Sequence, residues 1–235
     1  MARKVVLCTL GAGPHEELLS VAGPTFERWA QRHRYDLDIR RSSPSPERPP
    51  SWGKVSIISE RLLTHDVVIW LDADAVVVDP THDLSHAVSR RKPLALVAHE
   101  YQGQTVPNMG VVAIRSTRLT RRLMRDLWSM TQHVDHRWWE NAALLEVLGY
   151  DISTEPIVLR EPTRLNDRIA WLDVAWNSID LHPSPAPFVK HYPGLSNDER
   201  RRRMSDDVAM VDAWHRTTPP GELSGAHARR GRRDR

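Results

Sequence analysis

A run of five apolar residues, Val67–Leu71, ends directly in two carboxylates, Asp72 and Asp74. An uninterrupted run of this kind, rich in β-branched residues, is typical of a strand that is buried on both faces of a sheet. In extended structure the i, i+2 spacing points both aspartates to the same side. Because open α/β sheets bind ligands beyond the carboxyl ends of their strands, the pattern predicts a site there for a divalent cation, Mg²⁺ or Mn²⁺, and a phosphate-bearing substrate.

Strand-like and helix-like segments alternate along the chain. Strands are expected at Lys4–Thr9, Tyr35–Arg40, Val67–Leu71, Leu94–Ala98 and Gly110–Ile114, with short extended pieces at Pro156–Leu159, Val174–Trp176 and Phe188–His191. Helices are expected at His15–Arg34, Trp52–Thr64, Thr117–Gln132, Glu140–Leu148 and Ser196–Arg216. Gly23-Pro24 should break or kink the first helix, and His99–Met109 is expected to be a polar loop. The alternation predicts a single Rossmann-like α/β/α sandwich with a mostly parallel central sheet.

The excess of positive charge lies at the C-terminus. The 235 residues carry a formal net charge of +3, and residues 217–235 hold five arginines against Glu222 and Asp234. We therefore expect one folded domain over residues 1–216, without the basic face that nucleic-acid binding needs, and a basic disordered tail over residues 217–235. Residues 41–51 contain four prolines and four serines, a composition that predicts a mobile loop.

Cysteine content and hydropathy bear on the compartment. Cys8 is the only cysteine, so no internal disulfide can form, which fits a reducing environment. The apolar run Val5–Leu10 is short and is followed at once by Gly11, which favours a first strand over a signal peptide. No run approaches the ~20 apolar residues that a membrane-spanning helix needs. We expect a cytoplasmic protein with no membrane span.

Three further segments carry polar groups suited to a ligand. His191 closes the expected strand Phe188–His191 and is either an ordinary polar end or a metal ligand beside carboxylates. Asn108, two residues before Gly110, could bind a hydroxylated ligand, or the segment could be a plain turn into a strand. Trp138–Asn141 puts two aromatic faces beside a carboxylate and an amide. That composition suits sugars, although large aromatic residues more often belong to the core.

The aspartate pair has two other interpretations. In the first, its residues only cap a turn; against this, two carboxylates about 4 Å apart repel by roughly 4 kcal/mol at an effective dielectric constant near 20, and a divalent cation reverses that sign. The string also matches the opening of haloacid-dehalogenase-type phosphatases, with Asp72 as nucleophile and Asp74 as acid/base. Such an enzyme needs a late acidic motif at a strand end, and the one candidate here, Ser205–Asp212, lies in a charged helical stretch.

The order of several short motifs resembles that of a group of retaining glycosyltransferases. The group comprises the fungal α-galactosyl/α-mannosyltransferases and plant xyloglucan xylosyltransferases, and more distantly the glycogenin-like enzymes. The matching segments, from about Lys4 to Gly194, are Trp29 with His33–Leu37, Trp52–Lys54, Trp70–Ala75, Asn108–Val111, Glu140–Leu144, Trp176-Asn177 and His191–Gly194. The resemblance implies a GT-A fold and a reaction that transfers a sugar from a nucleotide-diphospho sugar to the hydroxyl of a glycan or small molecule. It further implies retention of the sugar's configuration and favours a UDP-sugar as the donor.

The same resemblance implies roles for individual residues. Asp72, Asp74 and His191 would hold Mn²⁺ or Mg²⁺, which bridges the donor diphosphate. Around the metal, Cys8, Thr9 and Leu10 would bind the base and ribose of the donor, and Lys54 would bind its phosphates or sugar. Asp72 would also contact the donor, and Gly110 and Gly194 would do so through close approach of their backbone. The implied catalytic group, which grips the transferred sugar and the acceptor, is Asn108, Glu140 and Asn141, with Asn141 near the reacting face of the sugar.

The chain departs from the resembled pattern in three ways. The glycogenin-like pattern has a lysine shortly after His-x-x-Gly to hold the diphosphate, whereas Leu195–Asp198 follows Gly194 here, leaving Lys190 or Arg200 as substitutes. Asn141 stands where the family usually has glutamine. The eukaryotic members carry a membrane anchor and stem that this chain does not show, which fits a bacterial cytoplasmic enzyme. Because this lysine is missing, the chain could also be a catalytically inactive relative that only binds sugars.

Overall fold

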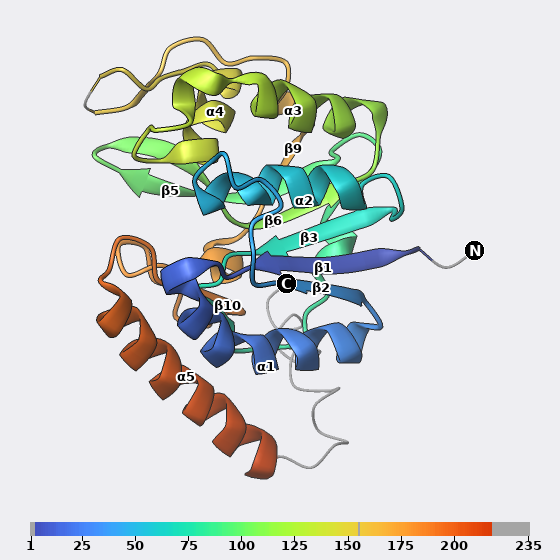
Figure 1. Ribbon diagram of the computed structural model, residues 1–235, viewed down its shortest axis with the longest axis vertical. Coiled ribbons are helices and arrows are strands. Elements are labelled where there is room, and N and C mark those ends of the chain that lie inside the picture. Colours follow the sequence, from blue (N-terminus) through green and yellow to red (C-terminus); the bar gives the residue numbers. More distant parts are fainter. Residues whose placement is uncertain (1–2, 155, 218–235) are drawn as a thin grey trace, which may run out of the picture.

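A six-stranded sheet forms the centre of the molecule. The computed structural model describes residues 3–154 and 156–217 (Figure 1). In spatial order the strands are β2 (Asp36–Arg40), β1 (Val5–Leu10), β3 (Val67–Leu71), β6 (Gln104–Arg115), β5 (Leu94–Tyr101) and β9 (Ile169–Trp171). Strand β6 runs antiparallel to β3 and β5, and the other neighbouring pairs are parallel. The predicted mostly parallel sheet is therefore confirmed.

Helices cover both faces of the sheet, which makes an α/β/α sandwich (Figure 1). On one face lie α2 (Gly53–Arg61), α3 (Arg118–Ser129) and α4 (Trp139–Leu148); on the other lies α1 (Glu16–His33), with α5 (Asn197–Thr217) packed against it. The strand β3 is buried at every position, with Val68 and Trp70 in the core under α2 and Ile69 in the core under α1. Its unbroken apolar run reflects this burial on two sides.

Short elements complete the fold. β4 (Ala75–Val77) pairs antiparallel with β10 (Val189–His191), and β7 (Tyr150–Asp151) pairs with β8 (Val158–Leu159). The 3₁₀-helices are η1 (Gly13–His15), η2 (Pro50–Trp52), η3 (Leu84–Ala87), η4 (Thr131–His133), η5 (Asn166–Arg168) and η6 (Val174–Asn177). The last of these corrects an expectation of extended chain over Val174–Trp176. The carboxylate of Asp173 accepts a hydrogen bond from the Ala175 amide, which favours a helical turn.

The helix α1 continues through Gly23 and Pro24 without the expected break. Proline costs about 3 kcal/mol in a helix interior. That cost is offset because the same helix fully buries Phe26 and Trp29 against the sheet, and each large apolar side chain contributes about 1.5–3 kcal/mol on burial. Tertiary packing here outweighs local propensity.

The expected polar loop His99–Met109 is instead the tip of a long hairpin. Strands β5 and β6 pair from Leu94 with Ile114 to Tyr101 with Gln104. The turn residues Gln102 and Gly103 both have positive φ, 51° and 76°, as two-residue hairpin turns require. At the C-terminus, helix α5 reaches Thr217, while the rest of the expected tail, residues 218–235, lies outside the described residues.

Candidate metal and donor site

The backbone brings three candidate ligands to one end of β3. The chain turns sharply after this strand, with the Asp72 amide donating to the Gly110 carbonyl and the Ala75 amide donating to the Asp72 carbonyl. It then enters β4, whose partner β10 places His191 opposite Ala75. Residues that are far apart in the sequence therefore meet beside the carboxyl end of β3, where the pattern of β3 predicted a site.

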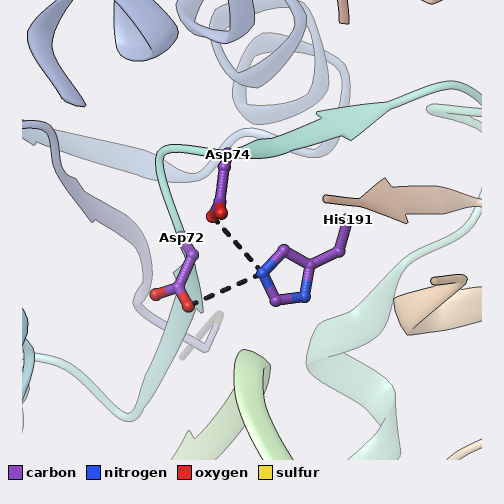
Figure 2. A group of neighbouring side chains, drawn as sticks. All are labelled: Asp72, Asp74 and His191. Atoms are coloured by element: carbon purple, nitrogen blue, oxygen red, sulfur yellow. Dashed lines mark ion pairs between the residues drawn. The ribbon is translucent and has the colours of Figure 1, made fainter. Parts of the chain in front are cut away.

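Asp72, Asp74 and His191 form a compact group (Figure 2). The Nε2 atom of His191 lies 3.3 Å from Oδ1 of Asp74 and 3.9 Å from Oδ2 of Asp72. One ligand atom from each residue lies within 4.8 Å of the other two. The side chains of Asp74 and His191 are buried, whereas that of Asp72 is 27% exposed, so the group can be reached from solvent on the Asp72 side.

The His191 ring is oriented by an amide behind it. Its Nδ1 lies 2.9 Å from Oδ1 of Asn177; because an amide oxygen only accepts, Nδ1 carries a proton, and Nε2 is the ring nitrogen that faces the carboxylates and could bind a cation. Asn177 in turn donates from Nδ2 to Oδ1 of Asn108, which also accepts from the Gly110 amide. Metal-binding histidines are usually oriented by such a partner on the other ring nitrogen.

Gly110 is required by the close approach of this imidazole. A Cβ atom on Gly110 would lie 2.2 Å from Cε1 of His191, which no side chain can accommodate without displacing the ring. The close approach seen at this glycine is to a neighbouring side chain of the site, and its expected contact with a donor stays a prediction.

The donor set suits a divalent cation. Two carboxylates and one neutral imidazole are ligands that Mn²⁺ accepts, and Mg²⁺ accepts the carboxylates. Burial alone would raise the pKa of Asp74, but without a metal the nearby positive charges of His191 and Arg200 outweigh it and hold that pKa below its usual range. Asp74 is therefore an ionised ligand at neutral pH.

Lys54 neutralises the opposite side of the site. Its buried Nζ lies 2.9 Å from Oδ1 of Asp72 and 2.7 Å from Oε1 of Glu140, and it also donates to the Met109 carbonyl. Burial would lower the pKa of Lys54, yet the two carboxylates raise it above its usual value. Because the Trp70 indole also donates to Oδ1 of Asp72, that oxygen is occupied and Oδ2 is the one turned toward His191.

Glu140 and Asn141 are held at the start of α4. Oε2 of Glu140 is buried and has no hydrogen-bond partner among the described residues. Burial raises the pKa of Glu140, and Lys54 only partly opposes that rise. The amide of Asn141 accepts from the Met109 amide and donates to the Pro107 carbonyl, so it fastens α4 to β6 beside the site.

The residues expected around the nucleotide lie at the end of β1. Cys8, Thr9 and Leu10 are all buried, and burial raises the pKa of the Cys8 thiol. The hydroxyl of Thr9 is buried and has no hydrogen-bond partner among residues 3–154 and 156–217. Gly194, in the turn between β10 and α5, has φ of 76°, a conformation that glycine adopts readily. Their contact with a nucleotide stays a prediction.

The two candidate substitutes for the missing lysine lie in different places. Lys190 turns away from the group and pairs with Asp207 on α5, with 2.6 Å between Nζ and Oδ1. Arg200, in the first turns of α5, lies with Nε 3.4 Å from Oδ2 of Asp74 and also donates to the Tyr192 carbonyl. Of the two, Arg200 is the cation next to the candidate ligands.

Two residues that shape the site were not assigned roles from the sequence. Asn177 belongs to the matching segment Trp176-Asn177 but carried no function, although an asparagine directly after the apolar run Val174–Trp176 signals a buried amide in need of partners. Trp70 was counted as core, and its indole N–H, the donor to Asp72, is a group that seeks a partner when buried.

Comparison with known proteins identifies the fold. No protein-family model and no curated protein matches the chain, but solved structures do. The fold is that of the GT-A-type glycosyltransferases. A glycosyltransferase involved in the glycosylation of the major capsid of PBCV-1 is similar over 86% of this chain and 99% of its own, with a TM-score of 0.65 and 15% identity. The galactosyltransferase LgtC, in complex with donor and acceptor sugar analogs, matches 94% of this chain and 99% of its own, with a TM-score of 0.56 and 11% identity. The glycosyltransferase GlyE of Streptococcus pneumoniae TIGR4 matches 92% of this chain and 64% of its own, with a TM-score of 0.56 and 16% identity.

The phosphatase interpretation is not favoured by these findings. Its late acidic segment lies within α5. There Asp207 accepts hydrogen bonds from Lys190 and Tyr192 and is not part of the group of Asp72 and Asp74. In the described part of the chain, no helix is long and apolar enough to cross a membrane.

Proposed function

We propose that this protein is a metal-dependent glycosyltransferase that moves a sugar from a nucleotide-diphospho sugar to a hydroxyl acceptor. One observation carries the proposal: in a GT-A-type fold, Asn177 binds Nδ1 of His191, so that Nε2 of the ring faces the carboxylates of Asp72 and Asp74. Two acidic residues and an imidazole oriented in this way have the composition of a metal site.

The chain's own residues would prepare the site for a doubly charged leaving group. Asp72, Asp74 and His191 would hold Mn²⁺ or Mg²⁺, whose charge stabilises a departing nucleotide diphosphate. Lys54 places a positive charge between Asp72 and Glu140, since its ammonium group lies within 3 Å of both. The close packing of Trp70, Lys54 and Asn177 around the ligands keeps them in place as charge develops.

Arg200 would take the part of the absent diphosphate lysine. Its guanidinium is next to Asp74 and is held by the Tyr192 carbonyl, and arginine suits a diphosphate because its planar fork matches phosphate oxygens. Replacing Arg200 by alanine should weaken UDP binding in the presence of Mn²⁺ and leave uridine binding unchanged. Lys190→Ala is the matched control, because Lys190 is engaged by Asp207. Equal UDP affinities in the two variants would remove Arg200 from this role.

Finer features of the proposal rest on the resemblance to the fungal, plant and glycogenin-like enzymes. They are a UDP-sugar as donor, transfer with retention of configuration, and contacts of Asn108, Glu140 and Asn141 with the transferred sugar and the acceptor. The buried, unpartnered Oε2 of Glu140 supports a ligand contact there, since buried carboxylate oxygens normally find a donor.

Calorimetry with UDP tests the proposal directly. UDP should bind the wild-type protein when Mn²⁺ is present and bind much more weakly without it. Asp74→Asn should abolish the gain from Mn²⁺, whereas Asp126→Asn, which alters an exposed ion pair with Arg122, should not. UDP binding that ignores both Mn²⁺ and Asp74 would overturn the metal site. If the protein binds a donor but forms no product with any saccharide in a panel of acceptors, it is a sugar-binding relative without activity. If it releases phosphate from a phosphoester in the absence of an acceptor, the phosphatase interpretation is favoured.

A further inference from the structure

His99 is a buried histidine whose ring nitrogens are unpaired in the described part of the chain. It lies on β5 with only 4% of its surface exposed, and neither ring nitrogen has a hydrogen-bond partner among the described residues. Other buried histidines of this protein are paired: His133 with Glu146, and His191 with Asn177. Leaving buried polar atoms unpaired lowers stability, so two such atoms on one ring call for an explanation.

A second histidine faces the first. The ring of His182 lies 5.8 Å from that of His99, centroid to centroid, in an edge-to-face arrangement, and its own Nδ1 is buried without a partner. Burial lowers the pKa of His99 to about 4, and positive charge on His191 or His182 acts in the same direction. At neutral pH the ring of His99 is therefore uncharged, with one nitrogen that donates and one that accepts.

The position of His99 relates it to the sugar end of a donor. In the sheet, β1 lies on one side of β3 and β5 lies on the other, beyond β6. The expected nucleotide residues are at the end of β1, and the candidate metal ligands follow β3. On β5, Val97 pairs with Asn108 two residues before His99, and Asn108 is hydrogen-bonded to the Asn177 that orients His191. His99 therefore lies at the same edge of the sheet as these ligands. A donor that crosses the site from β1 would point its sugar toward β5.

We propose that His99 and His182 form a subsite for a sugar hydroxyl beside the group of Asp72, Asp74 and His191. A hydroxyl both donates and accepts a hydrogen bond, so one placed between the two rings could donate to a bare nitrogen of one imidazole and accept from an N–H of the other. A second metal site is not supported: in the described part of the chain, only Asp72, Asp74 and His191 bring three ligand atoms close enough together. The inference rests on the proposed function, and the hydroxyl belongs either to the donor sugar or to the acceptor.

His99→Phe is the test, because phenylalanine keeps an aromatic ring and removes both nitrogens. The melting temperature should stay the same or rise, since two unpaired polar atoms leave the interior. His133→Phe is the matched control: it alters an equally buried histidine that is bonded to Glu146, so its melting temperature should fall while ligand binding is unchanged.

Binding and kinetics then distinguish the two sources of the hydroxyl. Calorimetry uses UDP, UDP-glucose and UDP-galactose with Mg²⁺; transfer assays use lactose and methyl glycosides. If His99 binds the donor sugar, His99→Phe weakens UDP-sugar affinity roughly three- to tenfold and leaves UDP affinity unchanged. If it binds the acceptor, donor affinities are unchanged and the KM for the saccharide rises by a similar factor.

The inference is overturned if His99→Phe matches the wild type in UDP-sugar affinity and in the KM for every saccharide that the wild type uses. A clear fall in the melting temperature of His99→Phe would also count against it, because the ring would then have a structural partner. Failure of the wild-type protein to bind any UDP-sugar is a different result, which would refute the proposed function itself.

Discussion

Replacing Lys54 by methionine leaves two carboxylates without their cation. The side chains of Lys54 and Glu140 are each only 5% exposed, whereas that of Asp72 is 27% exposed, so water can compensate Asp72 but not Glu140. Removing one partner of a buried ion pair costs about 3–5 kcal/mol. Each kcal/mol lowers the melting temperature of a domain of this size by roughly 2–4 °C, which gives an expected fall of roughly 6–20 °C.

Scanning calorimetry measures this fall, and a double variant tests its cause. Lys54→Met combined with Glu140→Leu removes both buried charges, and apolar residues often replace a buried ion pair without loss of stability. The double variant should therefore recover most of the lost melting temperature, with a coupling energy above about 1 kcal/mol between the two sites. Independent, additive effects of the two substitutions would refute the assignment of the cost to unpaired Glu140.

The pH dependence provides a second check on the same reasoning. Burial raises the pKa of Glu140, and Lys54 opposes that rise; without Lys54 the pKa is higher still. A carboxyl group with a raised pKa in the folded state contributes stability at low pH that is lost as the pH rises through that pKa. The difference in melting temperature between Lys54→Met and wild type should therefore narrow from pH 8 toward pH 5. A difference that does not vary with pH would contradict this.

Three other substitutions test the packing around the site and the fold. Asn177→Leu should weaken Mn²⁺ binding roughly 10- to 100-fold by calorimetry, because the tautomer of His191 is no longer fixed; unchanged affinity would mean that another group orients the ring. Gly110→Ala should also weaken Mn²⁺ binding while the far-UV circular dichroism stays the same, because its Cβ would displace that imidazole. Gly149→Ala should lower the melting temperature by more than about 4 °C, since its φ is 96° and its Cβ would lie 1.8 Å from the Glu161 carbonyl oxygen; a smaller change would show that the turn adapts.

The central strand and its two aspartates could be predicted because one physical cause dominates there. Val67–Leu71 is apolar at every position since both faces of β3 are covered, and two carboxylates directly after such a strand stand where open α/β sheets bind ligands. The distal part of the β5–β6 hairpin was missed for the opposite reason. Beyond Ala98 it mixes polar residues such as His99 with apolar ones, and no sequence period distinguishes it from a loop. Only pairing across the hairpin, such as that of His99 with Val106, makes it a strand.

The candidate metal ligands could be predicted from the sequence, but the residues that hold them in place could not. Asp72, Asp74 and His191 stand at strand ends, where residue type alone points to chemistry. The partners of Lys54 depend on where α2 and α4 approach each other over the sheet, and no local pattern encodes that. Likewise, Arg200 could not be preferred to Lys190 from their spacing to Gly194. The choice follows from side-chain direction, which alternates in β10 and leaves Lys190 facing Asp207 on α5.

The position of the third ligand depends on hydrophobic pairing more than on the histidine itself. β10 is only three residues long, and its register against β4 sets Val189 opposite Val77 and His191 opposite Ala75. Val189 and His191 are buried, while Lys190 between them points to the other side. A slip of one residue would turn every side chain of β10 to the opposite face, directing Lys190 toward the carboxylates and the imidazole toward α5. The burial of two valines therefore selects the register that allows His191 to meet Asp74, more than one hundred residues earlier in the chain.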